Sequence, residues 1–216
     1  APTAATWAAV TDFMAATDPK NMDIRWSTTS SAGRSRSGNE NMLLVVRLVN
    51  LKLHLTTGTR VHRATNPLVL VDLPDVGARF YTFLWTLTHL MEACSGAGLP
   101  MVVLDRPNPN GHYVDGPVME VAHRSFLGMT EIPLVYGMTI GEYAQMINEE
   151  GWLEGGLKAD LQVIPLQGYS HATGYDLPIP PSPNLPNAQA VRLYPSLGLF
   201  EGTYVNAGRG TSYQFQ

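Results

Sequence analysis

Charged residues are scarce in this chain. They make up 15% of its 216 residues, against about 25% in a typical soluble domain. The net charge is −4, so the chain lacks the excess of Lys and Arg by which proteins bind nucleic acids or anionic membranes. Cys94 is the only cysteine, which excludes an internal disulfide, and its apolar-periodic surroundings predict a buried thiol. No apolar run approaches the roughly 18 residues of a transmembrane helix.

Several catalytic and cofactor motifs are also absent. No glycine-rich dinucleotide fingerprint follows a predicted strand, and there is no phosphate-binding P-loop, no G-x-S-x-G nucleophile elbow and no H-E-x-x-H zinc motif. The histidines show no pair at a metal-ligand spacing; they are His54, His62, His89, His112, His123 and His171. We therefore expect neither a cofactor nor a metal.

Residues 1–66 give weak structural signals. A short helix is predicted over 6–16, and the Ser-, Gly- and Arg-rich segment 27–38 predicts a solvated loop. Segment 42–55 passes from a continuous apolar run to alternation, which favours a strand with one exposed side.

A strand, a helix and a second strand follow in close succession. Segment 68–73 is a continuous apolar run, typical of a strand covered on both faces. Apolar residues at spacings of three and four predict an amphipathic helix over 80–93, which Gly96 and Gly98 end. Segment 101–104 predicts a second buried strand. Together they predict a βαβ unit with a parallel sheet and a right-handed crossover.

The loops that follow these two strands open on the same edge of the sheet, where open α/β proteins bind ligands. Residues 72–79 form the first loop and residues 105–111 the second. We expect five polar residues to line one cleft there: Asp75, Arg79, Asp105, Arg106 and Asn108. The Asp and Asn residues can also be read as turn formers beside Pro and Gly.

The remainder of the chain alternates structured and loop segments. Thr139 and Glu142 predict the capping box of a helix. Segment 160–166 predicts a strand, in which Pro165 indicates either a sheet edge or the end of the strand. Segment 178–186 predicts a stiff extended segment, and 200–210 predicts a glycine-rich loop. Carboxylates and arginines in such loops, with aromatic residues nearby, suit sugar chemistry on a carboxylate-bearing substrate.

Five segments in order resemble the bacterial exo-β-N-acetylmuramidases of the NamZ type: 72–109, 116–120, 136–142, 180–186 and 200–211. The resemblance covers about residues 67–216. It implies a Rossmann-like α/β fold, in which a parallel sheet is joined to a smaller second domain, here truncated. The expected division is a poorly matched segment 1–66, a Rossmann-like domain 67–135 and the start of the second domain, 136–216.

The resemblance implies a glycosidase, a hydrolase that removes N-acetylmuramic acid from non-reducing ends of peptidoglycan fragments of the cell wall. Muramic-acid-containing saccharides or muropeptides are the expected partners. A periplasmic or secreted location is expected, with a cytoplasmic one left open.

Each candidate residue then has an expected role. Glu120 and Glu201, in matched motifs, are the candidates for acid–base or substrate-orienting groups. Arg79 and Arg209 are expected to contact the lactyl carboxylate of muramic acid. The expected sugar-contacting and cleft-forming residues are Asp75, Asp105, Arg106, Asn108 and Asn206.

Two departures from the family pattern keep other hypotheses open. The family's Pro-Glu-His-Gly motif, whose glutamate is the favoured catalytic residue, does not occur in residues 1–66. Family members also continue beyond the segment that ends this chain. The alternatives are a non-catalytic muropeptide- or sugar-binding protein and an inactive fragment of a longer enzyme.

Overall fold

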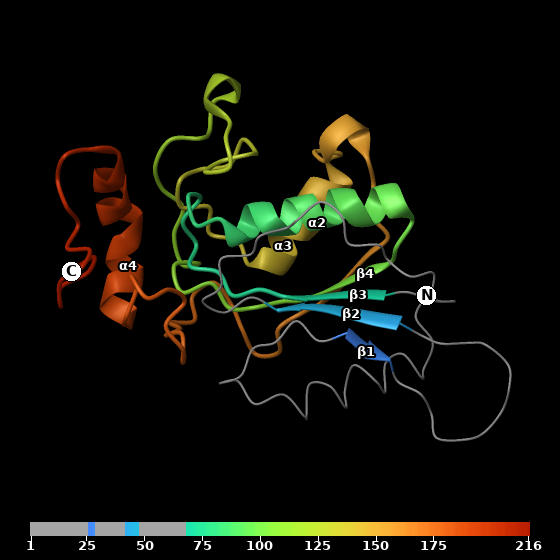
Figure 1. Ribbon diagram of the computed structural model, residues 1–216, viewed down its shortest axis with the longest axis horizontal. Helices are drawn as coiled ribbons and strands as arrows, with labels where there is room; N and C mark the ends of the chain where they lie inside the picture. The colour runs from blue at the N-terminus through green and yellow to red at the C-terminus, as the bar shows by residue number, and fades with distance from the viewer. Residues whose placement is uncertain (1–25, 29–41, 48–67) are drawn as a thin grey trace, which may run out of the picture.

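The computed structural model describes residues 26–28, 42–47 and 68–216 (Figure 1). These residues form a five-stranded sheet in the order β1-β2-β3-β4-β5. The strands are β1 Trp26–Thr28, β2 Met42–Arg47, β3 Leu68–Asp72, β4 Met101–Leu104 and β5 Leu161–Ile164. The pairing of β1 with β2 is antiparallel and the other three pairings are parallel, which confirms an α/β fold with a parallel sheet.

The two central strands β3 and β4 are buried along their whole length. Val69 and Val71 belong to the core under helices α2 and α3, whereas Leu68 and Leu70 belong to a second apolar cluster with Val102 of β4. Alternate side chains of a strand point to opposite faces, so both faces of the sheet are covered here. The prediction from the continuous apolar runs is confirmed.

Helix α2 spans Phe83–Ala97 and lies with α3 on one face of the sheet (Figure 1). It begins and ends later than the predicted range 80–93. Gly98 is the residue that ends it, with a left-handed φ of 63° and an N–H that donates to the carbonyls of Cys94 and Ser95. Cys94 is buried as predicted, and burial raises the pKa of its thiol to about 11.

Helix α3 spans Ile140–Glu149 and begins with the predicted capping box. The Thr139 hydroxyl accepts from the Glu142 N–H at 3.2 Å, and the Glu142 carboxylate accepts from the Thr139 N–H at 2.8 Å. Strand β5 lies at the edge of the sheet and ends directly before Pro165, also as predicted.

The C-terminal part contains helix α4, Ala188–Leu197, which the sequence reading missed. It packs on the loop after β3 through a core that includes Val76, Val191 and Phe215. Three short 3₁₀ helices complete the described secondary structure: η1 Val121–His123, η2 Glu154–Gly156 and η3 Gly198–Gly202. The last of them begins before the predicted glycine-rich loop 200–210 and ends within it.

Four predictions need correction or lie partly or wholly beyond the described residues. Segment 178–186 is not uniformly extended, because the Leu185 N–H donates to the Ser182 carbonyl and closes a turn. Residues 27 and 28 belong to β1 rather than to a loop. Strand β2 confirms the strand predicted from residue 42, up to residue 47. The helix predicted over 6–16 and the rest of 27–38 and 42–55 lie outside the described residues.

Residues on both sides of the expected domain division at residue 136 contribute to one sheet and one core. Strand β5 pairs with β4, and Ile140 and Tyr143 of α3 pack in the core with Val69 of β3. Within the part of the chain that the structure describes, no helix is long and apolar enough to cross a membrane.

Candidate functional site

The loops after β3 and β4 meet at the carboxyl edge of the sheet, as parallel pairing requires. Asp72 is the last residue of β3, and Arg106 follows β4 by two residues. The Arg106 Nε donates to Asp72 Oδ1 at 2.6 Å, and Nη2 forms an ion pair with the same oxygen, also at 2.6 Å. This carboxylate raises the pKa of Arg106, so the guanidinium is a permanent cation at the edge.

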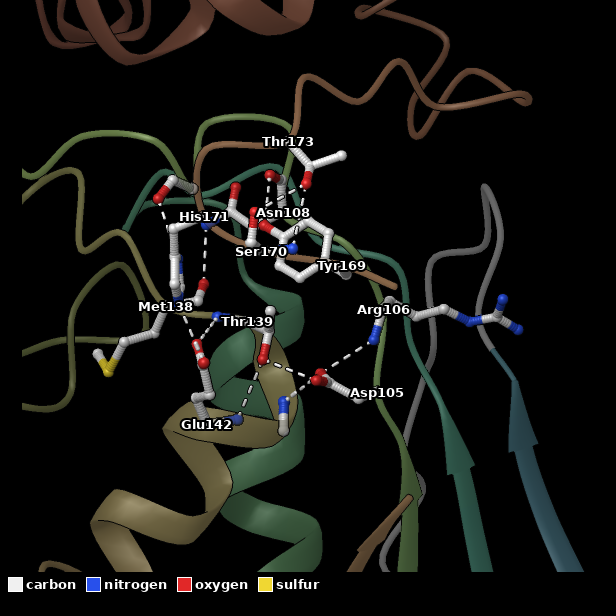
Figure 2. A network of polar contacts seen from close by, with 12 residues as sticks. Asp105, Arg106, Asn108, Met138, Thr139, Glu142, Tyr169, Ser170, His171 and Thr173 are labelled. Atoms are coloured by element: carbon white, nitrogen blue, oxygen red, sulfur yellow. Dashed lines mark hydrogen bonds and ion pairs between the residues drawn. The ribbon is translucent and has the colours of Figure 1, made fainter. Parts of the chain in front are cut away.

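Asp105 ties the end of β4 to the beginning of helix α3 (Figure 2). Its carboxylate accepts from the Gly141 N–H at 2.8 Å, from the Thr139 hydroxyl at 2.9 Å and from the Arg106 N–H at 3.0 Å. Burial raises the pKa of the Asp105 carboxyl, although these hydrogen bonds oppose the rise. The side chain thereby fixes the helix N-terminus against the sheet.

Glu142 and His171 form an exposed ion pair beside Asp105 (Figure 2). The His171 Nε2 lies 3.0 Å from the Glu142 carboxylate, and Nδ1 lies 3.1 Å from the Gly111 carbonyl. Carboxylate and carbonyl oxygens only accept hydrogen bonds, so both ring nitrogens are favoured as donors and the imidazolium form is stabilised. The Glu142 contact accordingly raises the pKa of His171.

Asn108 is buried and fully engaged in holding loops together. Its Nδ2 donates to the Met138 carbonyl at 2.8 Å, and its Oδ1 accepts from the Asn110 N–H at 2.8 Å. The hydroxyl of Tyr169 donates to the Asn108 carbonyl at 3.2 Å. Gly77 lies so close that a Cβ there would stand 2.3 Å from Asn108 Oδ1.

Asp75 is buried below the same edge. Its Oδ2 accepts from the Gly77 N–H at 3.0 Å and from the Tyr136 hydroxyl. Its Oδ1 has no hydrogen-bond partner among the described residues. Burial raises the pKa of this carboxyl to about 6, because the ionised form loses its hydration.

Arg79 is a buried cation, only 8% exposed. Its Nη1 donates to the carbonyls of Pro117 and Ile132, at 2.8 Å and 2.6 Å. Arg79 therefore joins the two ends of the segment that runs from Pro117 to Ile132. Burial lowers the pKa of the guanidinium.

The remaining predicted residues lie elsewhere. The Glu120 side chain is 77% exposed, and its nearest ionic neighbour is His123 at 3.9 Å. Glu201 pairs with Arg209 at 2.8 Å, and the Asn206 Oδ1 accepts from the Arg209 N–H at 2.9 Å. No contact within the described residues joins Glu120 to Glu201 or either of them to the edge.

The structure thus separates the predicted residues into groups. The inner cluster, defined as Asp75, Arg79, Asn108 and Asn110, is buried and holds loops. The edge cluster consists of Asp72, Asp105, Arg106, Glu142 and His171; Asp72 is buried, whereas the side chains of Arg106, Glu142 and His171 are accessible. Glu201, Asn206 and Arg209 form a third group near the C-terminal end of the described structure.

Three members of the edge cluster were absent from the sequence-based set of site residues. Asp72 carried a usable signal, since it is the last residue of a predicted buried strand in a parallel sheet. Glu142 was recognised only as a helix cap. His171 had no local signal, because it reaches the edge from a loop that follows β5.

The edge cluster offers one guanidinium, one imidazolium and accessible carboxylate oxygens. The side chains of Arg106, Glu142 and His171 are 39%, 43% and 48% exposed. Such a set suits a polar ligand that carries a negative charge. No group of three His, Cys, Asp or Glu side chains among the described residues is arranged to hold a metal ion.

Comparisons with known proteins identify the family. The solved structures of two DUF1343 family proteins from Bacteroides fragilis are similar in fold. The first is 53% identical with a TM-score of 0.68, and it is matched over 69% of this chain and 42% of its own. The second is 33% identical with a TM-score of 0.65, over 69% of this chain and 40% of its own.

A curated relative, the peptidoglycan beta-N-acetylmuramidase NamZ of Bacillus subtilis, is 42% identical over 154 residues, which are 69% of this chain and 36% of the relative. The chain therefore spans about a third of the length of that relative. The family model for the N-terminal part of exo-beta-N-acetylmuramidase NamZ matches residues 52–189, and the model for its C-terminal part matches 192–216. This chain belongs to the NamZ family of exo-beta-N-acetylmuramidases.

Proposed function

We propose that this protein acts on N-acetylmuramic acid at the non-reducing ends of peptidoglycan fragments, as a glycoside hydrolase. The observation that carries the proposal is the family match over residues 52–216, whose N-terminal part contains the whole edge cluster. The chemistry of that cluster supports it. N-acetylmuramic acid bears a carboxylate on its lactyl group, and cations at an accessible sheet edge are suited to bind it.

Hydrolysis of a glycosidic bond requires a proton donor for the leaving oxygen and a group that activates water or stabilises the developing positive charge. The edge cluster contains three carboxyl groups, of Asp72, Asp105 and Glu142, together with the imidazole of His171, and the Asp72 carboxylate is paired with Arg106. Asp105 is occupied by three donors, which suits it to positioning. The Glu142–His171 pair retains accessible polar atoms from which a proton could be transferred.

The test is release of nitrophenol from para-nitrophenyl β-N-acetylmuramide by the 216-residue chain, with the β-N-acetylglucosaminide as control. Turnover of the muramide alone is expected of an exo-muramidase. The same assay on Glu120→Gln, Glu201→Gln and Glu142→Gln would identify the required carboxylate. Equal turnover of both substrates would contradict the proposed specificity.

A second candidate function is binding of muramyl saccharides without hydrolysis. It is supported by the positions of Glu120 and Glu201, which have no described contact with the edge cluster. Saturable binding of N-acetylmuramic acid together with no nitrophenol release would favour this second function.

A further inference from the structure

The three arginines near the matched motifs differ in how much hydrogen-bonding capacity they retain. Arg79 is buried, with Nη1 bound to two carbonyls. Arg209 is paired with Glu201, and its guanidinium carbon lies 5.9 Å from the centre of the Phe215 ring. Among the described residues, Arg106 is paired on one side only, and it lies at the carboxyl ends of the central strands.

The pairing of Arg106 leaves a complete edge of the guanidinium available. Nε and one hydrogen of Nη2 are directed to Asp72 Oδ1. Nη1 and the second hydrogen of Nη2 have no acceptor among the described residues, and the side chain is 39% exposed. Two parallel N–H groups on that edge match the two oxygens of a carboxylate.

Asp72 makes this arrangement rigid. The last residue of a buried strand is fixed by the sheet, and its carboxylate holds the guanidinium by the adjacent edge, which Nε and Nη2 form. Figure 2 shows the Arg106 side chain extending away from helix α3, while Asp105 turns toward that helix. A preorganised guanidinium loses less conformational entropy on binding than a freely rotating one.

We propose that Arg106, oriented by Asp72, binds the lactyl carboxylate and makes the site specific for N-acetylmuramic acid over N-acetylglucosamine. This inference rests on the proposed function and assigns its specificity to one residue. The carboxylate-binding role that the sequence analysis gave to Arg79 and Arg209 is thereby reassigned to Arg106. Asp72 is a positioning residue.

The test measures binding of three methyl β-glycosides to the full chain by titration calorimetry: the N-acetylmuramide, its lactyl methyl ester and the N-acetylglucosaminide. The ester has the shape of the muramide without its charge. We expect the native chain to bind the muramide at least about tenfold more tightly than the other two, as loss of a charged bidentate contact predicts.

Arg106→Gln should abolish this preference, so that all three glycosides bind with similar weak affinity. Arg106→Lys keeps a positive charge beside Asp72 but cannot present paired N–H groups, so the preference should fall several-fold. Arg124→Gln is the matched control, since Arg124 forms an exposed ion pair with Glu131 at 3.1 Å, and it should keep the full preference. Thermal unfolding of each variant establishes that it is folded.

Two outcomes separate the two proposals. If Arg106→Gln or a folded Arg106→Lys retains the full preference for the muramide, the role of Arg106 is overturned while the proposed function stands. If the native chain binds none of the glycosides, or all three equally, the proposed function fails and this inference fails with it.

Discussion

The inner cluster and the edge cluster lie at the same end of the sheet and both contain aspartate and arginine, yet these side chains have different roles in the two clusters. In the inner cluster, the side chains of Asn108 and Arg79 donate hydrogen bonds to backbone carbonyls of distant loops. In the edge cluster, the Arg106 and His171 side chains are 39% and 48% exposed, and among the described residues only Asp72 pairs with the Arg106 guanidinium. Burial and prior occupation, rather than residue type, decide which polar groups at a sheet edge can meet a ligand.

The largest expected effect is on the inner cluster, from Gly77→Ala. The left-handed φ of 75° is unfavourable for alanine, and the new Cβ would meet the Asn108 amide, which is fixed by Met138 and Asn110. We expect the free energy of unfolding to fall by about 3 kcal/mol, measured by urea denaturation.

Gly155→Ala is the matched control for that variant. Gly155 has a similar φ of 65°, and nothing lies within 4 Å of its hypothetical Cβ. Gly155→Ala should lower the free energy of unfolding by only about 1 kcal/mol, because it has the unfavourable backbone conformation without a steric clash. Equal losses at the two glycines would contradict a tightly packed inner cluster.

The next effect is the pH dependence that Asp75 contributes. Its pKa is raised from 3.8 to about 6, so the folded protein holds the proton more tightly than the unfolded chain does. The contribution to stability is full below about pH 4 and is lost as the pH rises through 6. A shift of this size corresponds to on the order of 2–3 kcal/mol between pH 4 and pH 7.

Asp75→Asn should remove this component, so its unfolding free energy should fall less between pH 4 and pH 7 than that of the native chain. Asp160→Asn, at an exposed position, is the control and should keep the native profile. Parallel profiles for native and Asp75→Asn chains would show that Asp75 is not a buried proton-holding group.

Arg79→Met tests whether Arg79 stabilises the loops or binds the ligand, because the first role predicts a loss of stability and the second a loss of muramide affinity. The Pro117 carbonyl would lose its donor and the Ile132 carbonyl would keep only the Met119 N–H, at a cost of about 2 kcal/mol in unfolding free energy. Amide hydrogen exchange should increase between residues 117 and 132. Arg124→Met, which removes an exposed pair, should change stability by less than about 1 kcal/mol. If Arg79→Met instead weakened muramide binding and left stability unchanged, Arg79 would be a ligand-binding residue.

The smallest effect concerns His171. Its pKa is raised by Glu142, so the stabilisation is full below the ordinary histidine pKa and is lost as the pH rises through the raised value. Both side chains are about half exposed, so His171→Gln should cost on the order of 0.5 kcal/mol at pH 6 and almost nothing at pH 9. His123→Gln is the control, because its ionic contact with Glu120 is longer, at 3.9 Å. A loss independent of pH would contradict the ion pair.

The predictions from sequence succeeded where a local pattern was decisive. Continuous apolar runs identified β3 and β4, and the Thr139–Glu142 spacing identified the start of α3. Helix α4 was missed because Pro195 lies inside it and the preceding segment is rich in proline. The turn at Ser182–Leu185 was missed because proline content does not distinguish an extended chain from a bent one.

The sequence by itself determined the α/β class, the parallel pairing of β3 with β4 and the edge at which the two polar loops meet. These follow from short-range periodicity and from the geometry of a βαβ crossover. The tertiary structure alone decided that Asn108 and Asp75 are buried, that one edge of the Arg106 guanidinium has no acceptor among the described residues, and that His171 lies beside Glu142. Burial and pairing depend on residues that are remote along the chain, and no local pattern records which of them come into contact.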